Sequence, residues 1–372
     1  MIIADILTAI GLGLALMHFT VPLAYYMHLR KKWFYKPWNV KKDYDYRPKI
    51  CIVIPTYKEA DRIWLKLNNI YEQDYPRDKM HIIVVDSASP DNTVDVVRKW
   101  ASNHSDVELT ILEEPIRRGL VHALNYALKY VPEDCEIVIF TDADAYWSRD
   151  TLRNVIAYFA DTSIGAVTAS ILPNTDEARG EYTYREYYNV IRISESKMYS
   201  TPIHNGVLVA FRYKLLKVIG GLPTYTGNDD STPASLIAFM GYRAIQVDDV
   251  VVSEHLLEKG QVMRKIRRAQ HLILHFLHTK RYAKKLGIYK RTSFDKIWNI
   301  EAYLHLINPW LLLLATLLLV MQALHDLIAL ALLILGAILL TYKPYRTWII
   351  NQIILIVATF RNIVTKDIIW QK

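Results

Sequence analysis

An uncharged stretch near the N-terminus constrains this chain more than any other feature. Residues 6–27 contain no Asp, Glu, Lys or Arg. At about 1.5 Å of rise per residue, a helix of this length crosses a hydrocarbon core of about 30 Å. A cleaved signal peptide would need a basic start and a small-residue cleavage site, whereas this chain begins MIIAD and leaves the stretch as HLRKKWFYK. The sequence therefore favours a transmembrane helix within residues 1–29.

Further apolar stretches lie near the C-terminus. Residues 302–325 and 327–342 are uncharged, with only Asp326 between them, and predict a transmembrane hairpin within 301–343. Residues 347–360 are a shorter apolar run that contains Asn351 and Gln352, so the segment 344–372 is predicted to lie at the membrane interface. The expectation is three crossings in total.

The distribution of positive charge predicts the orientation. The linker 30–48, taken with Lys49, holds eight Lys or Arg against two Asp, whereas the loop at Asp326 holds none. The polar middle of the chain is therefore expected in the cytoplasm. Residues 259–291 hold eleven Lys or Arg, no acidic residue and interleaved apolar side chains. This pattern predicts basic interfacial helices over 259–300, with a merely solvated basic face as the alternative. The net charge of +8 thus indicates a lipid surface rather than nucleic acid.

The middle, residues 49–258, alternates short apolar runs with helical patterns. This alternation is typical of an α/β domain with a mostly parallel sheet, whose ligands bind beyond the carboxyl ends of the strands. Two cysteines lie inside apolar runs, too few for a disulfide framework or a Cys-rich metal site. The predicted strands are 49–54, 81–86, 109–112 and 137–140, and the predicted helices are 60–73, 94–102 and 120–130.

Polar segments follow three of these strands, and they contain Thr56, Asp86 and the sequence TDAD at 141–144. Any one of them is compatible with an ordinary turn or helix cap. Asp142 and Asp144, two residues apart at a strand end, suit a hard cation, and the absence of a nearby His and Cys set favours Mg²⁺ or Mn²⁺ over Zn²⁺. Neither a P-loop nor a dinucleotide fingerprint occurs.

Several motifs in this order resemble those of the family 2 glycosyltransferases of GT-A (Rossmann-like) fold, over residues 49–270. Among these, the chain is similar to membrane-embedded, cellulose-synthase-like and polyprenyl-phosphate sugar synthase-like members. The matching motifs are VIPTYKE at 53–59, VVDSASPDNT at 84–93, RRGLVHALN at 117–125, TDAD at 141–144, HNGVLVAFR at 204–212, NDD at 228–230 and RKIRR at 264–268.

The resemblance implies a role for each matched residue. Asp86 corresponds to the aspartate that contacts the base, although Ser87 and Ala88 depart from the family pattern. Asp230 corresponds to the catalytic base and Asp229 to its neighbour. Asp142 and Asp144 correspond to the metal-binding pair, with Mn²⁺ or Mg²⁺ as the cofactor. The remaining implied donor-binding residues are Pro55, Thr56, Tyr57, Glu59, Arg118, Asp142, His204, Asn205, Gly206 and Arg267.

The residue types agree with this chemistry. A nucleotide diphosphate leaving group needs cations, which a divalent ion, Arg267 and Arg118 would supply. Asp230 could remove the proton of an acceptor hydroxyl in a single inverting displacement, and the alternative for Asp229 and Asp230 is the N-cap of a helix over 231–240. Processive members carry Gln and Trp where this chain has Arg264 and Arg268. The missing Trp, which helps to hold a growing polymer, indicates transfer of a single sugar.

The prediction is an inverting, metal-dependent glycosyltransferase of the cell membrane, with its catalytic domain in the cytoplasm. It would move mannose from GDP-mannose to a lipid-borne acceptor, either a dolichyl or polyprenyl phosphate or a lipid-linked glycan. A UDP-glucose or UDP-N-acetylglucosamine transferase of the same fold is the alternative within the class. Outside it, the chain could be a catalytically silent nucleotide-binding membrane protein or a lipid transporter with a regulatory domain.

Overall fold

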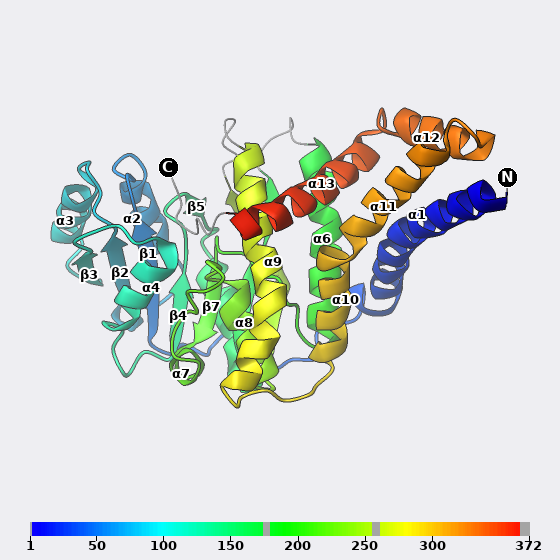
Figure 1. Cartoon of the computed structure of the whole chain (residues 1–372). Coiled ribbons are helices and arrows are strands. Elements are labelled where there is room, and N and C mark those ends of the chain that lie inside the picture. Colours follow the sequence, from blue (N-terminus) through cyan, green and yellow to red (C-terminus); the bar gives the residue numbers. More distant parts are fainter. Residues whose placement is uncertain (1, 174–178, 255–260, 365–372) are drawn as a thin grey trace.

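One mixed, mostly parallel sheet forms the centre of the molecule (Figure 1). The computed structural model describes residues 2–173, 179–254 and 261–364. Eight strands lie in the order β3-β2-β1-β4-β7-β6-β8-β5. Their bounds are β1 Ile50–Thr56, β2 Met80–Asp86, β3 Glu108–Glu113, β4 Ile137–Phe140, β5 Ala145–Tyr146, β6 Ile164–Pro173, β7 Val209–Arg212 and β8 Arg243–Glu254. The four strands expected from the sequence are β1 to β4.

The strand order creates a switch point between β1 and β4. From β1 the chain moves outward through β2 and β3, and then returns to pair β4 with the other side of β1. These pairings are all parallel, so the carboxyl ends of β1, β2 and β4 meet at one edge. Connections leave such a switch point in opposite directions and open a crevice, which is where α/β sheets bind their ligands.

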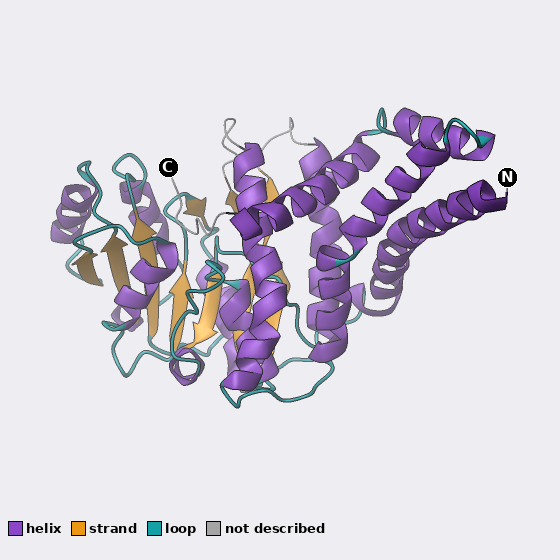
Figure 2. Cartoon of the chain, viewed as in Figure 1, coloured by secondary structure: helices purple, strands orange, loops and turns teal. Residues whose placement is uncertain are grey.

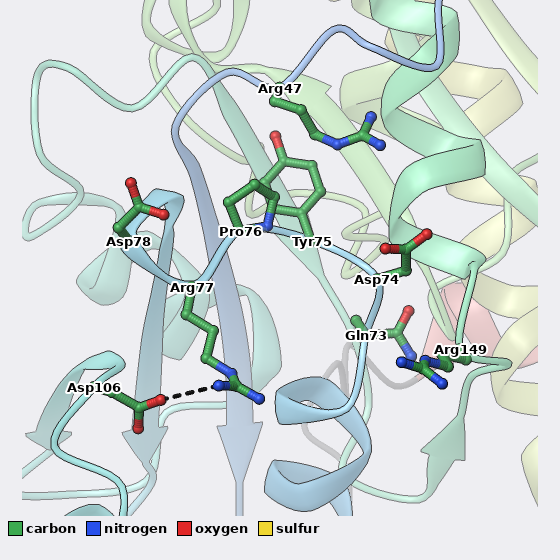
Figure 3. A pocket seen from close by; sticks show the side chains of 9 residues that line it. All are labelled: Arg47, Gln73, Asp74, Tyr75, Pro76, Arg77, Asp78, Asp106 and Arg149. Atoms are coloured by element: carbon green, nitrogen blue, oxygen red, sulfur yellow. Dashed lines mark hydrogen bonds and ion pairs between the residues drawn. The ribbon is translucent and has the colours of Figure 1, made fainter.

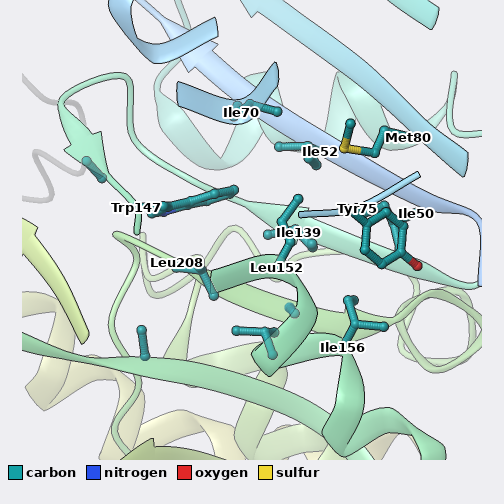
Figure 4. Close-up of a cluster of buried hydrophobic side chains, with 14 of the residues drawn as sticks. Ile50, Ile52, Ile70, Tyr75, Met80, Ile139, Trp147, Leu152, Ile156 and Leu208 are labelled. Atoms are coloured by element: carbon teal, nitrogen blue, oxygen red, sulfur yellow. The ribbon is translucent and has the colours of Figure 1, made fainter. Parts of the chain in front are cut away.

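The sheet has a hydrophobic core on each face because successive strand residues point to opposite sides. Ile52 packs with α2, α3 and α5 on one face (Figure 4), whereas Val53 packs with α4, α7 and α8 on the other. The helices are distributed accordingly (Figure 2). Around the sheet, their bounds are α2 Ile63–Tyr71, α3 Thr93–Asn103, α4 Leu120–Leu128, α5 Thr151–Ala157, α6 Arg179–Met198, α7 Tyr213–Val218 and α8 Ser231–Phe239, with single turns at Arg77–Lys79 and Tyr158–Ala160.

The remaining helices are α1 at the N-terminus and α9 to α13 at the C-terminus, and several of them are apolar (Figure 1). Three helical stretches in the described part of the chain are long and apolar enough to cross a membrane: α1 with the turn that follows it, α10 with α11, and α13. The bounds are α1 Ile2–Leu29 followed by Arg30–Phe34, α9 Gln261–Lys285, α10 Phe294–Leu306, α11 Asn308–Gln322, α12 Leu327–Leu339 and α13 Lys343–Val364.

The third candidate crossing differs from the expected one. The sequence predicts that residues 327–342 cross the membrane and that residues 347–360 lie at the membrane interface. In the structure, α12 is only 13 residues long, which gives about 20 Å of helix, whereas α13 has 22 residues because Lys343 to Arg346 and Arg361 to Val364 continue it at both ends. By length and composition, α13 is therefore the better candidate.

The basic helix α9 also differs from its prediction. Its apolar side chains were expected to lie on lipid headgroups, but Ile273 and Phe276 are buried in the protein. Phe276 belongs to the core beneath the sheet together with Trp298 of α10, and Ile273 packs against α13. The apolar stripe of α9 thus has a protein partner, and only residues such as Leu277 remain exposed.

Candidate active site

The carboxyl ends of β1 and β2 bring the first two predicted motifs together. Thr56 and Asp86 are direct partners in the strand register, and the Thr56 hydroxyl donates to Asp86 Oδ1 at 2.9 Å. Ser89 donates its backbone N–H and its hydroxyl to the same carboxylate, at 2.8 and 2.6 Å. The Asp86 side chain is buried and oriented by these three donors. A fixed carboxylate at this position can accept hydrogen bonds from a nucleobase.

The loop after β1 adds an aromatic ring, and the segment between β3 and α4 adds two cations. The Arg117 guanidinium lies over the Tyr57 ring, 3.6 Å from its centre, while Arg118 pairs with buried Glu114 at 3.4 Å. Glu59 is buried, and its backbone N–H donates to Thr93 Oγ1 at 3.0 Å. The structure thus brings Tyr57, Glu59 and the 117–118 pair to the same edge as Asp86. Arg117, which the sequence reasoning did not select, contacts Tyr57 directly.

The Asp142 and Asp144 pair follows β4 at the switch point. Thr141 is anchored to β1 because its N–H donates to Val53 O at 3.3 Å. Asp144 is partly exposed and lies 3.7 Å from Arg62. No group of three or more His, Cys, Asp or Glu side chains able to hold a metal occurs among the described residues. Two partly exposed carboxylates fit a Mn²⁺ or Mg²⁺ ion whose other ligands come from substrate phosphates and water.

A fully buried lysine lies behind this pair. Lys66 of α2 donates to Ala145 O at 2.5 Å, and its ammonium is 3.9 Å from the centre of the Trp147 ring. Burial lowers the pKa of Lys66 to about 7, and the charges of Asp142 and Asp144 oppose this lowering. The sequence reasoning missed Lys66, since it occupies an apolar position of an ordinary helical pattern. Its spacing from Ile63, Leu67 and Ile70 was the only available signal.

The predicted base Asp230 lies at the start of α8, where the structure confirms it as the N-cap, and its role as a base stays a prediction. Asp230 is the N-cap, and its carboxylate accepts from the Ser231 N–H and, at 2.8 Å, from the Ser231 hydroxyl. Asp229 precedes it, and burial together with the neighbouring Asp230 charge raises the pKa of Asp229 to about 7. Burial also raises the pKa of Asp230, but the Ser231 donors, Arg192 and Arg268 oppose that rise. Asp229 is therefore the member of the pair that more readily holds a proton near neutral pH, and Asp230 the member that more readily ionises.

The segment 204–206 lies beside these carboxylates. A Cβ atom on Gly206 would be 3.5 Å from Asp230 Oδ2 and 3.7 Å from Asp229 Oδ2, so this glycine is in van der Waals range of both groups. Burial lowers the pKa of His204 to about 3, and neither ring nitrogen has a hydrogen-bond partner among the described residues. His204 is thus a neutral, buried imidazole.

Arg192 lies beside the segment 204–206, and α9 carries a second cation, Arg267. Arg192 of α6 donates from Nη1 to Asn205 Oδ1 at 3.1 Å, and the sequence reasoning did not single it out. On α9, burial and the repulsion from Arg268 and Arg264 lower the pKa of Arg267 to about 10. Cations that repel each other in a partly buried place are favourable neighbours for an anion such as a diphosphate.

A cavity of about 560 Å³ lies away from these residues, on segments that precede β1, β2 and β3 (Figure 3). Arg77 and Asp106 form an ion pair of 3.2 Å at its wall. None of the predicted site residues lines it. Its lining is Arg47, Gln73, Asp74, Tyr75, Pro76, Arg77, Asp78, Asp106 and Arg149.

Comparisons with known proteins agree with this geometry. The family described as glycosyl transferase family 2 matches residues 51–220. The structure is similar to that of a mannosyltransferase from Pyrobaculum calidifontis, PcManGT, solved in complex with GDP-Man and Mn²⁺. The TM-score is 0.87 and the identity 48%, and the match covers 97% of this chain and 100% of that one.

Among curated proteins, glycosyltransferase AglE of Haloferax volcanii is 27% identical over 222 residues, which are 59% of this chain and 70% of AglE. The poly(ribitol-phosphate) β-N-acetylglucosaminyltransferase TarS of Staphylococcus aureus is 32% identical over 110 residues, 30% of this chain and 18% of TarS. The likeness to TarS is thus confined to about a fifth of that protein. Since the likeness to the Pyrobaculum protein extends over the whole of that chain, this protein belongs to glycosyltransferase family 2.

Proposed function

We propose that this glycosyltransferase moves a single mannosyl group from GDP-mannose, with Mn²⁺, to a lipid-borne acceptor at the cytoplasmic face of the membrane. The observation that carries the proposal is the 48% identity to the mannosyltransferase solved with GDP-Man and Mn²⁺, over 97% of this chain. Identity at this level supports the same donor and metal. The acceptor is inferred from the apolar helices that hold the catalytic domain at a bilayer.

The donor would lie across the switch point. Asp86 would accept hydrogen bonds from the base, and Asp142 and Asp144 would hold the metal ion. When bound, this ion supplies positive charge to the departing diphosphate. Arg267 would add a fixed cation on the opposite side. The mannose would then extend toward Gly206, which has no side chain of its own and lies next to the two carboxylates.

The transfer would proceed by one in-line displacement. The acceptor oxygen forms a bond to C1 of mannose while the bond from C1 to the diphosphate oxygen breaks, and GDP leaves with the electron pair. The acceptor proton passes to the Asp230 carboxylate, which is the member of the pair that the Ser231 donors and two arginines favour as an anion. The anomeric configuration inverts. An acceptor that attacks through an anionic phosphate oxygen would not need this base.

The experiment is a donor panel with purified protein in detergent. Labelled GDP-mannose, UDP-glucose or UDP-N-acetylglucosamine is supplied with Mn²⁺ and either dolichyl phosphate or extracted membrane lipid. We expect label to enter the organic phase from GDP-mannose only, and to be lost with a chelator or in Asp142→Asn. Asp134→Asn is the matched control, since Asp134 precedes β4 and its side chain is 65% exposed.

Each other outcome has a definite meaning. Preferential transfer from a UDP-sugar would reject the mannose donor but keep the enzyme class. Transfer to dolichyl phosphate alone, unaffected by Asp230→Asn, would identify a phosphate oxygen as the acceptor atom. Metal-dependent transfer to water but to no lipid would reject the lipid-borne acceptor.

A further inference from the structure

The base Asp230 has a charged neighbour that comes from a different part of the chain. Arg192 lies on α6, which packs against β6, β8 and α13. Its guanidinium donates to Asn205 Oδ1 at 3.1 Å and lies 5.6 Å from the centre of the Tyr188 ring. No motif used in the sequence analysis includes α6, and none of the proposed donor contacts involves it.

The orientation of Arg192 is set by a fixed partner. Asn205 donates from Nδ2 to Ala169 O at 3.2 Å and to Gln246 Oε1 at 3.3 Å, so its amide can turn only its oxygen toward Arg192. The Asn205 backbone N–H donates to Thr168 Oγ1 at 3.2 Å. Side-chain and backbone contacts to β6 and β8 thus hold the partner that orients the arginine.

The same segment leads from Arg192 to the base. Gly206 follows Asn205, and its Cβ position is 3.5 Å from Asp230 Oδ2. Asn205 and Gly206, which are adjacent in the chain, therefore connect Arg192 to the carboxylate pair. Within the described part of the chain, Asp229 precedes Asp230, Arg192 of α6 and Arg268 of α9 favour its anion, and the neutral His204 donates its backbone N–H to Ser231 Oγ, next to Asp230.

We propose that Arg192 is a positioning residue for the transfer reaction, which keeps Asp230 ionised and ready to accept the acceptor proton. The inference rests on the proposed role of Asp230 as base. Arg192 acts through the carboxylate rather than through the donor. Of the two cations that favour the Asp230 anion, Arg268 is exposed to solvent and Arg192 is half-buried, so Arg192 is screened less and contributes more.

The test is the pH dependence of kcat/KM for Arg192→Gln. Without the arginine the pKa of the carboxylate pair rises, and Asp230 is protonated over a wider range of pH. We expect activity to fall about 10-fold or more at pH 6 and to recover to within about threefold of the parent at pH 9, as the acidic limb moves about one unit upward. Arg192→Lys should restore most of the activity at low pH. Arg185→Gln, seven residues earlier on α6, should leave the profile unchanged.

A double variant separates this role from substrate binding. In the Asp230→Asn background, Arg192→Gln should cost less than about twofold, because its target is already absent. An equal fractional loss at every pH, or a full additional loss in that background, would overturn the inference. If Asp230→Asn alone keeps full transfer, both the base and this inference fail. If Asp230→Asn loses transfer but Arg192→Gln leaves the acidic limb in place, only this inference fails.

Discussion

Lys66 is a buried cation close to Asp142 and Asp144, and burying its charge lowers the free energy of unfolding. It is fully buried, and among the described residues its ammonium contacts only Ala145 O and the Trp147 ring. Asn69, one turn further on α2, donates to Trp147 O at 2.8 Å and accepts from the Trp147 N–H at 2.9 Å. This face of α2 thus holds the segment that follows Asp142 and Asp144, the proposed metal ligands, and Lys66 adds a charge there that an apolar residue could not.

Lys66→Met should therefore stabilise the fold. The pKa of Lys66 falls from 10.5 to about 7 on folding, so the folded state binds fewer protons between these values. The resulting penalty is full below pH 7, diminishes as pH rises and disappears near the unfolded pKa. Allowing for the lost hydrogen bond, we expect about 2–4 kcal/mol of added stability at pH 6.5.

Thermal unfolding at pH 6.5 and pH 10 measures this difference. The Lys66→Met variant should have a higher melting temperature than the parent at the lower pH and a similar one at the higher pH, while its transfer activity decreases. An equal or lower melting temperature at pH 6.5 would show that the contacts of Lys66 outweigh the cost of burying its charge.

The elements differ in how well local patterns predict them. Strands β1 to β4 were predictable because each is a short apolar run that ends in a polar turn, and the D-x-D motif follows one of them directly. Helix α6 was not assigned, because its polar and aromatic residues are mixed and give no clear apolar face in the sequence. Arg192 was missed for that reason. Its proposed role depends on the contact with Asn205, which β6 and β8 hold in place, and only the tertiary fold brings these segments together.

Gly165 of β6 shows how closely the elements approach one another. A Cβ atom on Gly165 would lie 2.4 Å from Ile237 Cγ2 of α8 and 2.8 Å from Leu215 Cδ1 of α7. Gly165→Ala should therefore overpack this contact and cost about 1–3 kcal/mol. Gly13→Ala is the control, because no atom lies within 4 Å of its Cβ position. Thermal unfolding should show a lower midpoint for the first variant only. Equal midpoints would mean that α8 moves aside freely.

Helix α6 is also joined to the apolar helices through Glu195. This buried carboxyl accepts from Tyr25 of α1 at 2.6 Å and from Thr201 at 2.8 Å. Burial and the nearby Glu301 raise the pKa of Glu195. The folded state therefore retains a proton that the unfolded chain releases, and stability is lost as pH rises above the ordinary glutamate range.

Glu195→Gln should remove this pH dependence. The melting temperature at pH 8 should rise by on the order of 3 °C, because the neutral amide has no proton to lose. At pH 4.5 the variant and its parent should differ little. A lower midpoint for the Glu195→Gln variant at pH 8 would indicate that the ionised carboxylate is the form that stabilises α6 against α1.

At the scale of the whole molecule, the predicted orientation can be tested with cysteines. Cys51 and Cys135 are buried, so the parent protein should resist a membrane-impermeant maleimide. Leu324, between α11 and α12, is 92% exposed, and Val218 at the end of α7 is 57% exposed. In intact cells, Leu324→Cys should be labelled at once and Val218→Cys only after the membrane is opened. The reverse pattern would place the catalytic domain outside.

The attachment of α1 has a consequence for which acceptors can react. Tyr25 is bonded to Glu195, Lys197 donates to Phe34 O at 2.8 Å, and Leu29 is buried. These contacts join the catalytic domain to α1. With α1 in the membrane, the reacting carbon would stay at a constant height above the bilayer. On a lipid-borne chain, each added sugar moves the new end away from that plane. The fixed height of the active site would then limit addition to acceptors of one length, without a binding pocket that recognises the length of the acceptor.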